Sequence, residues 1–358
     1  MYIYIHVPFC SHICTYCDFS KMLYDKKFVK KYLKVLATEI NTRYQDEEVL
    51  SIYIGGGTPT SLSLEELKYL LEITQRFKKA NQIEFTVESN IESLTKEKIK
   101  LLKQYGVNRI SLGVQSFQEK NLKTLGRHHH TQMVKEKIKE LKEVGFKNIS
   151  IDYIYGISDN IKEIEEDIHT FLALDIPHIS TYSLIIEKNT IFGIQEREYI
   201  EEETEYKMYK KIKQILEKNY YQHYEISNYA KLGYSSKHNL NYWNNGNYYG
   251  FGLGAVSYIH NKRINNTLNF SKYLENKYHQ EIIEEEKKIK ISNEFILGLR
   301  KIEGIDRNDF KRKYQEDILN IPEVKKLLQE KKLIFQNNHL FIADKYLYLS
   351  NEILINFI

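Results

Sequence analysis

The chain has few of the residues that would mark a secreted, membrane or nucleic-acid-binding protein. Its 358 residues include only three cysteines, four prolines and one tryptophan, and 52 basic residues nearly balance 48 acidic ones. Three cysteines cannot all pair in disulfides, and no apolar run approaches the roughly 18 residues of a membrane span. The start, MYIYIHVPFC, lacks the leader of a secretory signal. We therefore expect a cytoplasmic protein that is not integral to a membrane and binds no nucleic acid.

The first part of the chain alternates β-rich runs with amphipathic helical patterns. The expected strands cover 2–7, 50–54, 83–88, 109–114, 149–155 and 178–185. The expected helices cover 26–44, 64–79, 95–105, 131–144, 160–174 and 201–219. Six successive β/α units predict an α/β fold with a parallel sheet and right-handed crossovers. The strands are mostly apolar without clean alternation, which is typical of strands covered on both faces.

Local signals mark several helix ends. Ser63 and Glu66 have the spacing of a capping box, and Thr131 is expected as an N-cap. Gly106 follows an expected helix, where a residue with positive φ commonly ends the helical turn.

The pattern changes after about residue 230. The segment at 235–258 is rich in Asn, Gly and aromatic residues, and it predicts a loop with at most one short strand. Further helices are expected at 292–300, 306–315 and 322–331, followed by a hairpin that turns at Asn337 and Asn338. The predicted domains are therefore a barrel at 1–230, a connecting segment at 231–290 and a small α+β, winged-helix-like module at 291–358.

Polar residues gather where the expected strands end. A cysteine loop follows the first strand and GGGTPT (55–60) follows the second. Glu88 and Gln115 end the next two strands, whereas Asp152 and Tyr182 lie within the last two. The carboxyl ends of parallel strands form one rim, where ligands bind. This convergence predicts a binding site.

All three cysteines lie in one loop with the spacing C-x3-C-x2-C: Cys10, Cys14 and Cys17. A zinc site would need a fourth ligand, such as His6 or His12. Three thiolates can hold three irons of a 4Fe–4S cube and leave the fourth iron open for a small molecule. Inert structural thiols would be dispersed through the core. The spacing favours the cluster over zinc.

Several motifs resemble the radical S-adenosylmethionine (SAM) superfamily. CSHICTYCDF and GGGTPTSL carry the general resemblance. YIHVPFC, LGVQSF, GRHHH and IDYIYGI are similar to the branch that contains oxygen-independent coproporphyrinogen III oxidase and the related haem chaperones. The resemblance implies a partial (β/α)6 barrel with a small C-terminal module, which agrees with the six units counted above. It also implies a 4Fe–4S cluster held by the three cysteines, with SAM at the open iron.

Two features favour the chaperones within that branch. The oxidases have a fourth cysteine, C-x3-C-x2-C-x-C, where this chain has Phe19. The chaperones have H-N-x-x-Y-W, which this chain matches with His238, Asn239, Tyr242 and Trp243. The resemblance implies a chaperone that binds haem and transfers it to an acceptor haemoprotein. A membrane surface is one place where that acceptor could be located. The alternatives are coproporphyrinogen III decarboxylation and another radical SAM activity, such as methyl transfer.

The resemblance also implies roles for individual residues. The expected SAM contacts are Tyr4, Tyr16, Gly56, Gly57, Thr58, Glu88, Gln115, Arg127, Asp152 and Val256. Carboxylates suit ribose hydroxyls, and an arginine suits a carboxylate. The expected haem contacts are the four matching residues of the HNLNYW motif (238–243), namely His238, Asn239, Tyr242 and Trp243, with His238 as the axial ligand. The alternatives are a tight turn at the glycines, a surface cation at Arg127 and a packed, hydrogen-bonded histidine at His238.

Overall fold

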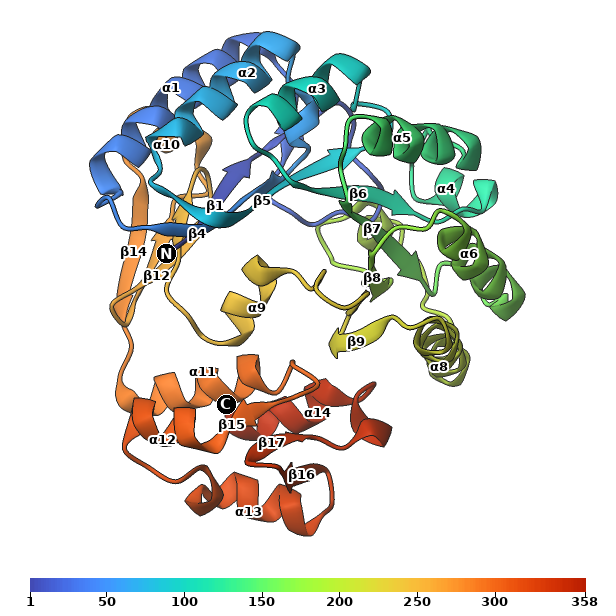
Figure 1. The fold of residues 1–358 in the computed structure, drawn as a ribbon, viewed down its shortest axis with the longest axis vertical. Coiled ribbons are helices and arrows are strands. Elements are labelled where there is room, and N and C mark those ends of the chain that lie inside the picture. Colours follow the sequence, from blue (N-terminus) through green and yellow to red (C-terminus); the bar gives the residue numbers. More distant parts are fainter.

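The computed structural model describes all 358 residues and is built around a nine-stranded sheet in the order β11-β1-β4-β5-β6-β7-β8-β10-β9. The six central strands are β1 (Tyr2–Val7), β4 (Val49–Gly56), β5 (Lys79–Asn90), β6 (Arg109–Gln115), β7 (Asn148–Tyr155) and β8 (His178–Ser183). All neighbours among these six are parallel. The sheet curves into a barrel that stays open on one side (Figure 1). The predicted partial barrel is therefore confirmed.

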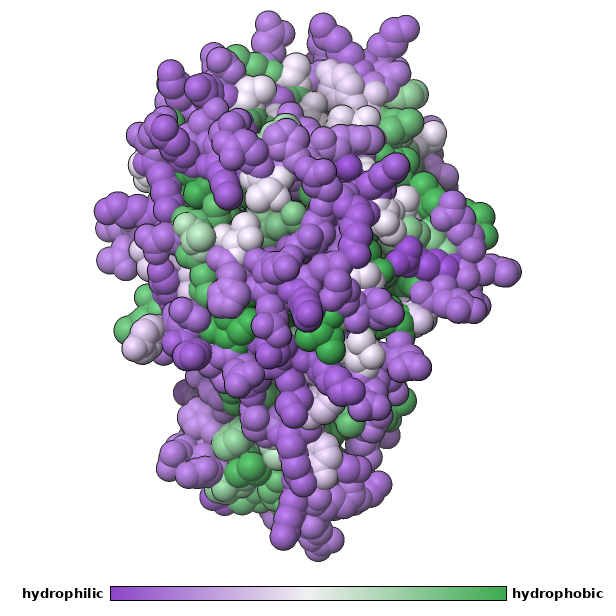
Figure 2. Space-filling model, turned by 90° about the vertical axis from the view of Figure 1, so that its right-hand side faces the viewer, coloured by the Kyte–Doolittle hydropathy of each residue, from purple (hydrophilic) through white to green (hydrophobic).

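Helices cover the outer face of this sheet (Figure 1). The long ones are α1 (Lys26–Arg43), α2 (Leu64–Ile73), α3 (Lys96–Gln104), α5 (Thr131–Glu143), α6 (Ile161–Ala173) and α8 (Glu202–Lys218). Two short ones, α4 (Glu119–Thr124) and α7 (Ile191–Ile194), had no sequence prediction. In α1, the buried Val29, Leu33, Leu36 and Ile40 recur at three- and four-residue intervals, which makes one apolar face. The side that presents α4, α5, α6 and α8 is mostly hydrophilic (Figure 2).

The predicted helix ends are mostly correct. The Ser63 hydroxyl accepts from the N–H of Glu66, and the Glu66 carboxylate accepts from the N–H of Ser63, so the capping box forms. Gly106 has φ +86° just beyond α3. The prediction for Thr131 is wrong by one residue, because His130 is the N-cap of α5. The Thr131 hydroxyl instead donates to the carbonyl oxygen of Phe117 at 2.8 Å.

The prediction of a mainly loop-like 235–258 segment is wrong. The segment after residue 230 contains α9 (Lys237–Trp243), β11 (Tyr249–Phe251), β12 (Val256–Ile259), β13 (Lys262–Asn266), α10 (Phe270–Leu274) and β14 (His279–Glu284). β11 pairs in parallel with β1, and β12, β13 and β14 form a small antiparallel sheet. A Cβ on Gly250 would lie 2.0 Å from the carbonyl oxygen of Val256. Glycine is thus required for this close approach, although by composition it indicates a loop.

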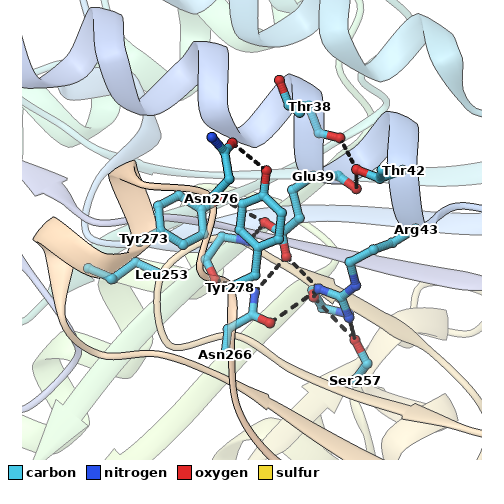
Figure 3. A network of polar contacts seen from close by, with 12 residues as sticks. Thr38, Glu39, Thr42, Arg43, Leu253, Ser257, Asn266, Tyr273, Asn276 and Tyr278 are labelled. Atoms are coloured by element: carbon cyan, nitrogen blue, oxygen red, sulfur yellow. Dashed lines mark hydrogen bonds and ion pairs between the residues drawn. The ribbon is translucent and has the colours of Figure 1, made fainter.

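A buried polar network fastens this segment to α1 (Figure 3). The Glu39 carboxylate is fully buried and forms an ion pair with Arg43. It accepts from the N–H of Gly252 at 2.9 Å, the Asn266 amide at 2.7 Å and the Tyr273 hydroxyl at 2.6 Å. A buried charge with this many donors is well compensated. The network holds β11 and the strands after it against the barrel.

The C-terminal module has a hydrophobic core of its own. Its elements are α11 (Lys287–Gly298), β15 (Ile305–Asp306), α12 (Arg307–Tyr314), α13 (Pro322–Gln329), β16 (Leu333–Gln336), β17 (His339–Ile342) and α14 (Ser350–Leu354). The predicted hairpin is confirmed, with φ of 50° at Asn337 and 65° at Asn338. The module joins the barrel at β9 (Gln222–Glu225), beside β10 (Asn228–Ala230). Two backbone hydrogen bonds connect them: the Ile226 N–H donates to the Arg300 carbonyl, and the Ile302 N–H donates to the Tyr224 carbonyl. None of the helices has the length and apolar character to cross a membrane.

Candidate functional site

A cavity of about 460 Å³ opens at the carboxyl ends of the six parallel strands. Its lining includes Cys10, Cys14, Tyr16, Cys17, Phe19, Gly56, Gly57, Thr58, Glu88, Gln115, Arg127, Asp152 and Tyr182. The fold thus brings together residues from loops that are far apart in sequence. Tyr4 and Val256 are not among the lining residues: the Tyr4 hydroxyl bonds His6 Nδ1 at 3.0 Å, and Val256 pairs with Asn265.

The three thiols lie around one part of this cavity. Cys10 ends the short β2 (Phe9–Cys10), which pairs with β3 (Met22–Leu23). Cys10 is buried, whereas Cys14 and Cys17 are partly exposed, and none of the three forms a disulfide. Burial raises the pKa of the Cys10 thiol to about 11. A thiolate at this position therefore needs a nearby metal charge.

The three thiols line the same cavity, where they could together hold a cluster. No three His, Cys, Asp or Glu side chains are arranged to hold a single metal ion. In a 4Fe–4S cube each thiolate binds a different iron, so its ligands surround the cluster and do not converge on one point. Phe19, at the position of a fourth cysteine, is 69% exposed at the lip of the cavity.

The glycine turn is shaped by its contact with the cysteine loop. Gly56 has φ +111°, and a Cβ on Gly57 would lie 2.8 Å from the carbonyl oxygen of Phe9. The N–H groups of Gly57 and Thr58 donate to the carbonyls of Val7 and Phe9, both at 2.8 Å. These N–H groups are consequently engaged within the protein. Glycine here serves the close approach of two loops.

Two partly buried carboxyl groups line the cavity from β5 and β7, the two neighbours of β6. Glu88 accepts from the Tyr53 hydroxyl at 2.7 Å and from the Gly56 N–H at 3.0 Å, and burial raises its pKa to about 7. Asp152 accepts from the Ser111 hydroxyl at 3.2 Å and 3.3 Å, and burial also raises its pKa. Additional donors, such as ribose hydroxyls, would stabilise both carboxylates.

Arg127 is a buried residue and not a surface cation. Only 2% of its side chain is exposed. Its guanidinium donates to the carbonyl oxygen of Gly113 at 2.6 Å and to Asn90 Oδ1 at 3.0 Å, and it lies 3.4 Å from the Glu92 carboxylate. Gln115, the last residue of β6, also lines the cavity and adopts φ +72°. A non-glycine residue in this region is unusual and often found at functional sites.

The HNLNYW motif forms α9, which lies nearer the amino ends of the strands. The Glu84 carboxylate of β5 accepts from the N–H groups of Lys237 and His238 at 3.1 and 3.0 Å. His238 is buried, with Nδ1 2.6 Å from the Ser51 hydroxyl and Nε2 2.9 Å from the Tyr242 hydroxyl. Burial lowers its pKa to about 3, so the ring is neutral. Both ring nitrogens are therefore engaged within the protein.

The residues of this motif face different cavities. Asn239 lines the cavity that contains the thiols. Tyr242 and Trp243 line a second cavity of about 270 Å³, together with Asn245, Gly246, Tyr248, Tyr258, Arg263 and Leu297. The Trp243 Nε1 is buried without a hydrogen-bond partner, and the Arg300 guanidinium lies 5.4 Å from the centre of its ring. Residues of the motif therefore line both cavities.

Sequence reasoning missed several residues of the site, among them Tyr53, Ser111, Asn90 and Glu92. Asn90 lines the thiol cavity, and Glu92 holds Arg127 and His129. The signal for Asn90 was its position two residues after Glu88 on the same strand, because alternate residues of a strand share a face.

A partial barrel with three thiols and a glycine turn at its carboxyl rim defines a radical SAM protein. Residues 4–171 match the sequence model of the radical SAM superfamily, which implies a 4Fe–4S cluster and SAM. The chain belongs to the HemW family. It is 39% identical to the haem chaperone HemW of Bacillus subtilis, covering 98% of this chain and 97% of that one. The haem chaperone HemW of Lactococcus lactis is 38% identical, with 99% and 96% covered.

A solved structure confirms the fold over the whole chain. Coproporphyrinogen III oxidase (HemN) from Escherichia coli, described as a radical SAM enzyme, superimposes with a TM-score of 0.86 and 19% identity. The match covers 99% of this chain and 89% of that one. At this identity the likeness concerns the fold alone.

Proposed function

We propose that this chain is a haem chaperone, which binds haem and transfers it to an acceptor haemoprotein. The observation that carries the proposal is its similarity to the HemW haem chaperones over nearly the full length of both chains. Phe19 in place of a fourth cysteine and the complete HNLNYW motif support it.

The proposed cluster site consists of Cys10, Cys14 and Cys17, each bound to one iron, with SAM at the open iron. When bound, the cluster would supply a site that chelates SAM and can pass on an electron. The proposed SAM contacts are the lining residues Tyr16, Gly56, Gly57, Thr58, Glu88, Gln115, Arg127 and Asp152. Tyr4 and Val256 remain weaker candidates because neither lines the cavity.

The proposed haem site is α9 with the second cavity, where Tyr242 and Trp243 offer aromatic surface. Burying an apolar macrocycle would supply most of the affinity, at about 25 cal/mol per Å² before association costs. The neutral imidazole of His238 suits an iron ligand. Ligation through Nε2 would require that the Tyr242 hydroxyl, now 2.9 Å away, turn aside.

The second candidate function is coproporphyrinogen III decarboxylation. The fold match to HemN over the whole chain favours it, whereas Phe19 is exposed at the position where that enzyme type has a further cysteine.

One experiment separates the two functions. The chain is reconstituted anaerobically with iron and sulfide, then tested in parallel for haem binding and for coproporphyrinogen III turnover with SAM and a reductant. We expect a Soret band on adding haem, haem transfer to an apo-haemoprotein, and no protoporphyrinogen. A Cys14→Ala variant should lose the cluster, whereas Phe19→Ala should keep close to wild-type iron and sulfide content. Protoporphyrinogen at enzymic rates, or no Soret band, would overturn the proposal.

A further inference from the structure

The thiols of Cys10 and Cys14 each accept a hydrogen bond from a side chain that is not itself a cluster ligand. The Thr58 hydroxyl donates to Cys10 Sγ at 3.8 Å. The Arg127 guanidinium donates to Cys14 Sγ at 3.7 Å. Both lengths are within the range for bonds to sulfur. These donors come from two different loops, after β4 and after α4.

Asn90, at the end of β5, connects the two donors. Its Nδ2 donates to Thr58 Oγ1 at 3.0 Å, and its Oδ1 accepts from the Arg127 guanidinium at 3.0 Å. The amide orientation follows from these partners, because a flipped amide would set its NH2 against the guanidinium, which has only donors. Since the Thr58 oxygen accepts from Asn90, its single proton is directed to Cys10.

Arg127 cannot easily leave this arrangement. Its second terminal nitrogen donates to the carbonyl oxygen of Gly113 at 2.6 Å and lies 3.4 Å from Glu92. The Glu92 carboxylate also accepts from the His128 N–H at 3.2 Å and lies 3.2 Å from His129 Nδ1. The side chain of His129 is fully buried. The guanidinium is therefore fixed on three sides and directed at Cys14.

We infer that Asn90 is a positioning residue for the cluster, which holds one donor on Cys10 and another on Cys14 and thereby sets the reduction potential. Hydrogen bonds to cluster sulfurs and nearby charge are among the factors that determine this potential. Donors stabilise the more negative, reduced state, so they raise the potential. The inference rests on the cluster of the proposed function, but not on haem binding.

The test measures the midpoint potential of the cluster in the reconstituted full-length protein without SAM. The redox titration is monitored by electron paramagnetic resonance. Asn90→Ala should give a more negative potential than wild type, because both donors lose their common anchor. Asn90→Asp should give a still more negative potential, because the Thr58 proton would turn to the carboxylate and a negative charge is added. Faster loss of the cluster in air should accompany both changes, because outer-shell partners help to hold a metal site.

Asn108→Ala is the matched control. Asn108, just before β6, also makes two hydrogen bonds to β5, with the Phe85 N–H at 2.9 Å and the Ile83 carbonyl at 2.7 Å, but it does not line the cavity. Its removal should leave the potential unchanged. If Asn90→Ala retains no cluster, Thr58→Val decides, since it removes the donor to Cys10 and should also lower the potential. A potential in the anchoring variants equal to that of the control would overturn the inference while leaving the proposed function intact. A wild-type chain that takes up no 4Fe–4S cluster would overturn both.

Discussion

The hydroxyl of Tyr242 lies 2.9 Å from Nε2 of His238, one helical turn away on α9. The other ring nitrogen is 2.6 Å from the Ser51 hydroxyl, so the imidazole has no nitrogen free for a metal in this arrangement. Haem ligation by His238 competes with this internal hydrogen bond. A bond of this kind contributes about 1 kcal/mol.

Tyr242→Phe should therefore favour haem ligation. Removing a competitor worth about 1 kcal/mol should tighten haem binding roughly fivefold, measured by Soret titration. His238→Ala should change the Soret spectrum clearly, with a modest loss of affinity. In the double variant the gain from Tyr242→Phe should vanish. A gain that persists without His238 would separate the histidine from the haem site.

Asp152→Ala should weaken SAM binding. Asp152 lines the cavity, and its carboxylate accepts from the hydroxyls of Ser111 and Ser180. A carboxylate has about four acceptor positions, so capacity for a ligand is left. A lost bond to a charged group costs about 1.5–3 kcal/mol, so affinity should fall by at least tenfold. Calorimetry on the reconstituted protein measures this. Asp159→Ala, at an exposed position, is the control. Equal SAM affinity in the two variants would remove Asp152 from the site.

Glu39→Ala should destabilise the fold strongly. It would leave Arg43 without its ion-pair partner and remove the acceptor for Gly252, Asn266 and Tyr273. Breaking a buried pair in this way costs about 3–5 kcal/mol. Denaturant unfolding measures the loss, and Glu352→Ala on the surface should change stability little. A loss as small as that of the control would show that the network contributes little to the fold.

Glu225→Gln should make stability less dependent on pH. Glu225 lies where the barrel meets the C-terminal module, and burial raises its pKa from 4.5 to about 7. A carboxyl group with a raised folded-state pKa stabilises the fold below its unfolded pKa, and this contribution is lost as pH rises towards 7. Over that interval the loss is on the order of 3 kcal/mol.

Unfolding of wild type and Glu225→Gln at pH 5 and pH 7.5 tests this sign. The wild type should lose more stability on going to the higher pH. Burial also raises the pKa of Glu88 to about 7. The Glu225→Gln variant should therefore keep the part of the pH dependence of stability that comes from Glu88. An unchanged pH dependence in the variant would mean that Glu225 ionises freely in the folded protein.

The barrel was predictable because each central strand contains a mostly apolar, β-rich core that is followed in the sequence by an amphipathic helical pattern. The thiol loop and the strand-end carboxyls were predictable because parallel strands bring their carboxyl ends together. The structure of the segment from α9 to β14 was not. Its strands are short, and Gly250 is needed for a backbone contact that only the folded chain shows.

The partners of His238 were hidden for a similar reason. Ser51 lies 187 residues away in the sequence, and no spacing rule connects the two. The resemblance implied a haem ligand, with a packed, hydrogen-bonded histidine as the alternative. The fold surrounds the ring with hydroxyl groups from β4 and α9. Arg127 shows the same limit, since the sequence could not tell a surface cation from one that Gly113 and Asn90 hold in the interior.

The pairing of β1 with β11 joins Ile3 to Tyr249, nearly the first residue of the barrel to its last strand. During synthesis the N-terminal strand therefore emerges long before its second neighbour exists. Contacts between residues so far apart in sequence form slowly, because the chain must lose the entropy of the intervening loop before the strand pairing contributes any stabilisation. The strand that leads into the cysteine loop keeps one edge open until most of the chain has been made, so completion of the barrel is expected to be a late event in folding.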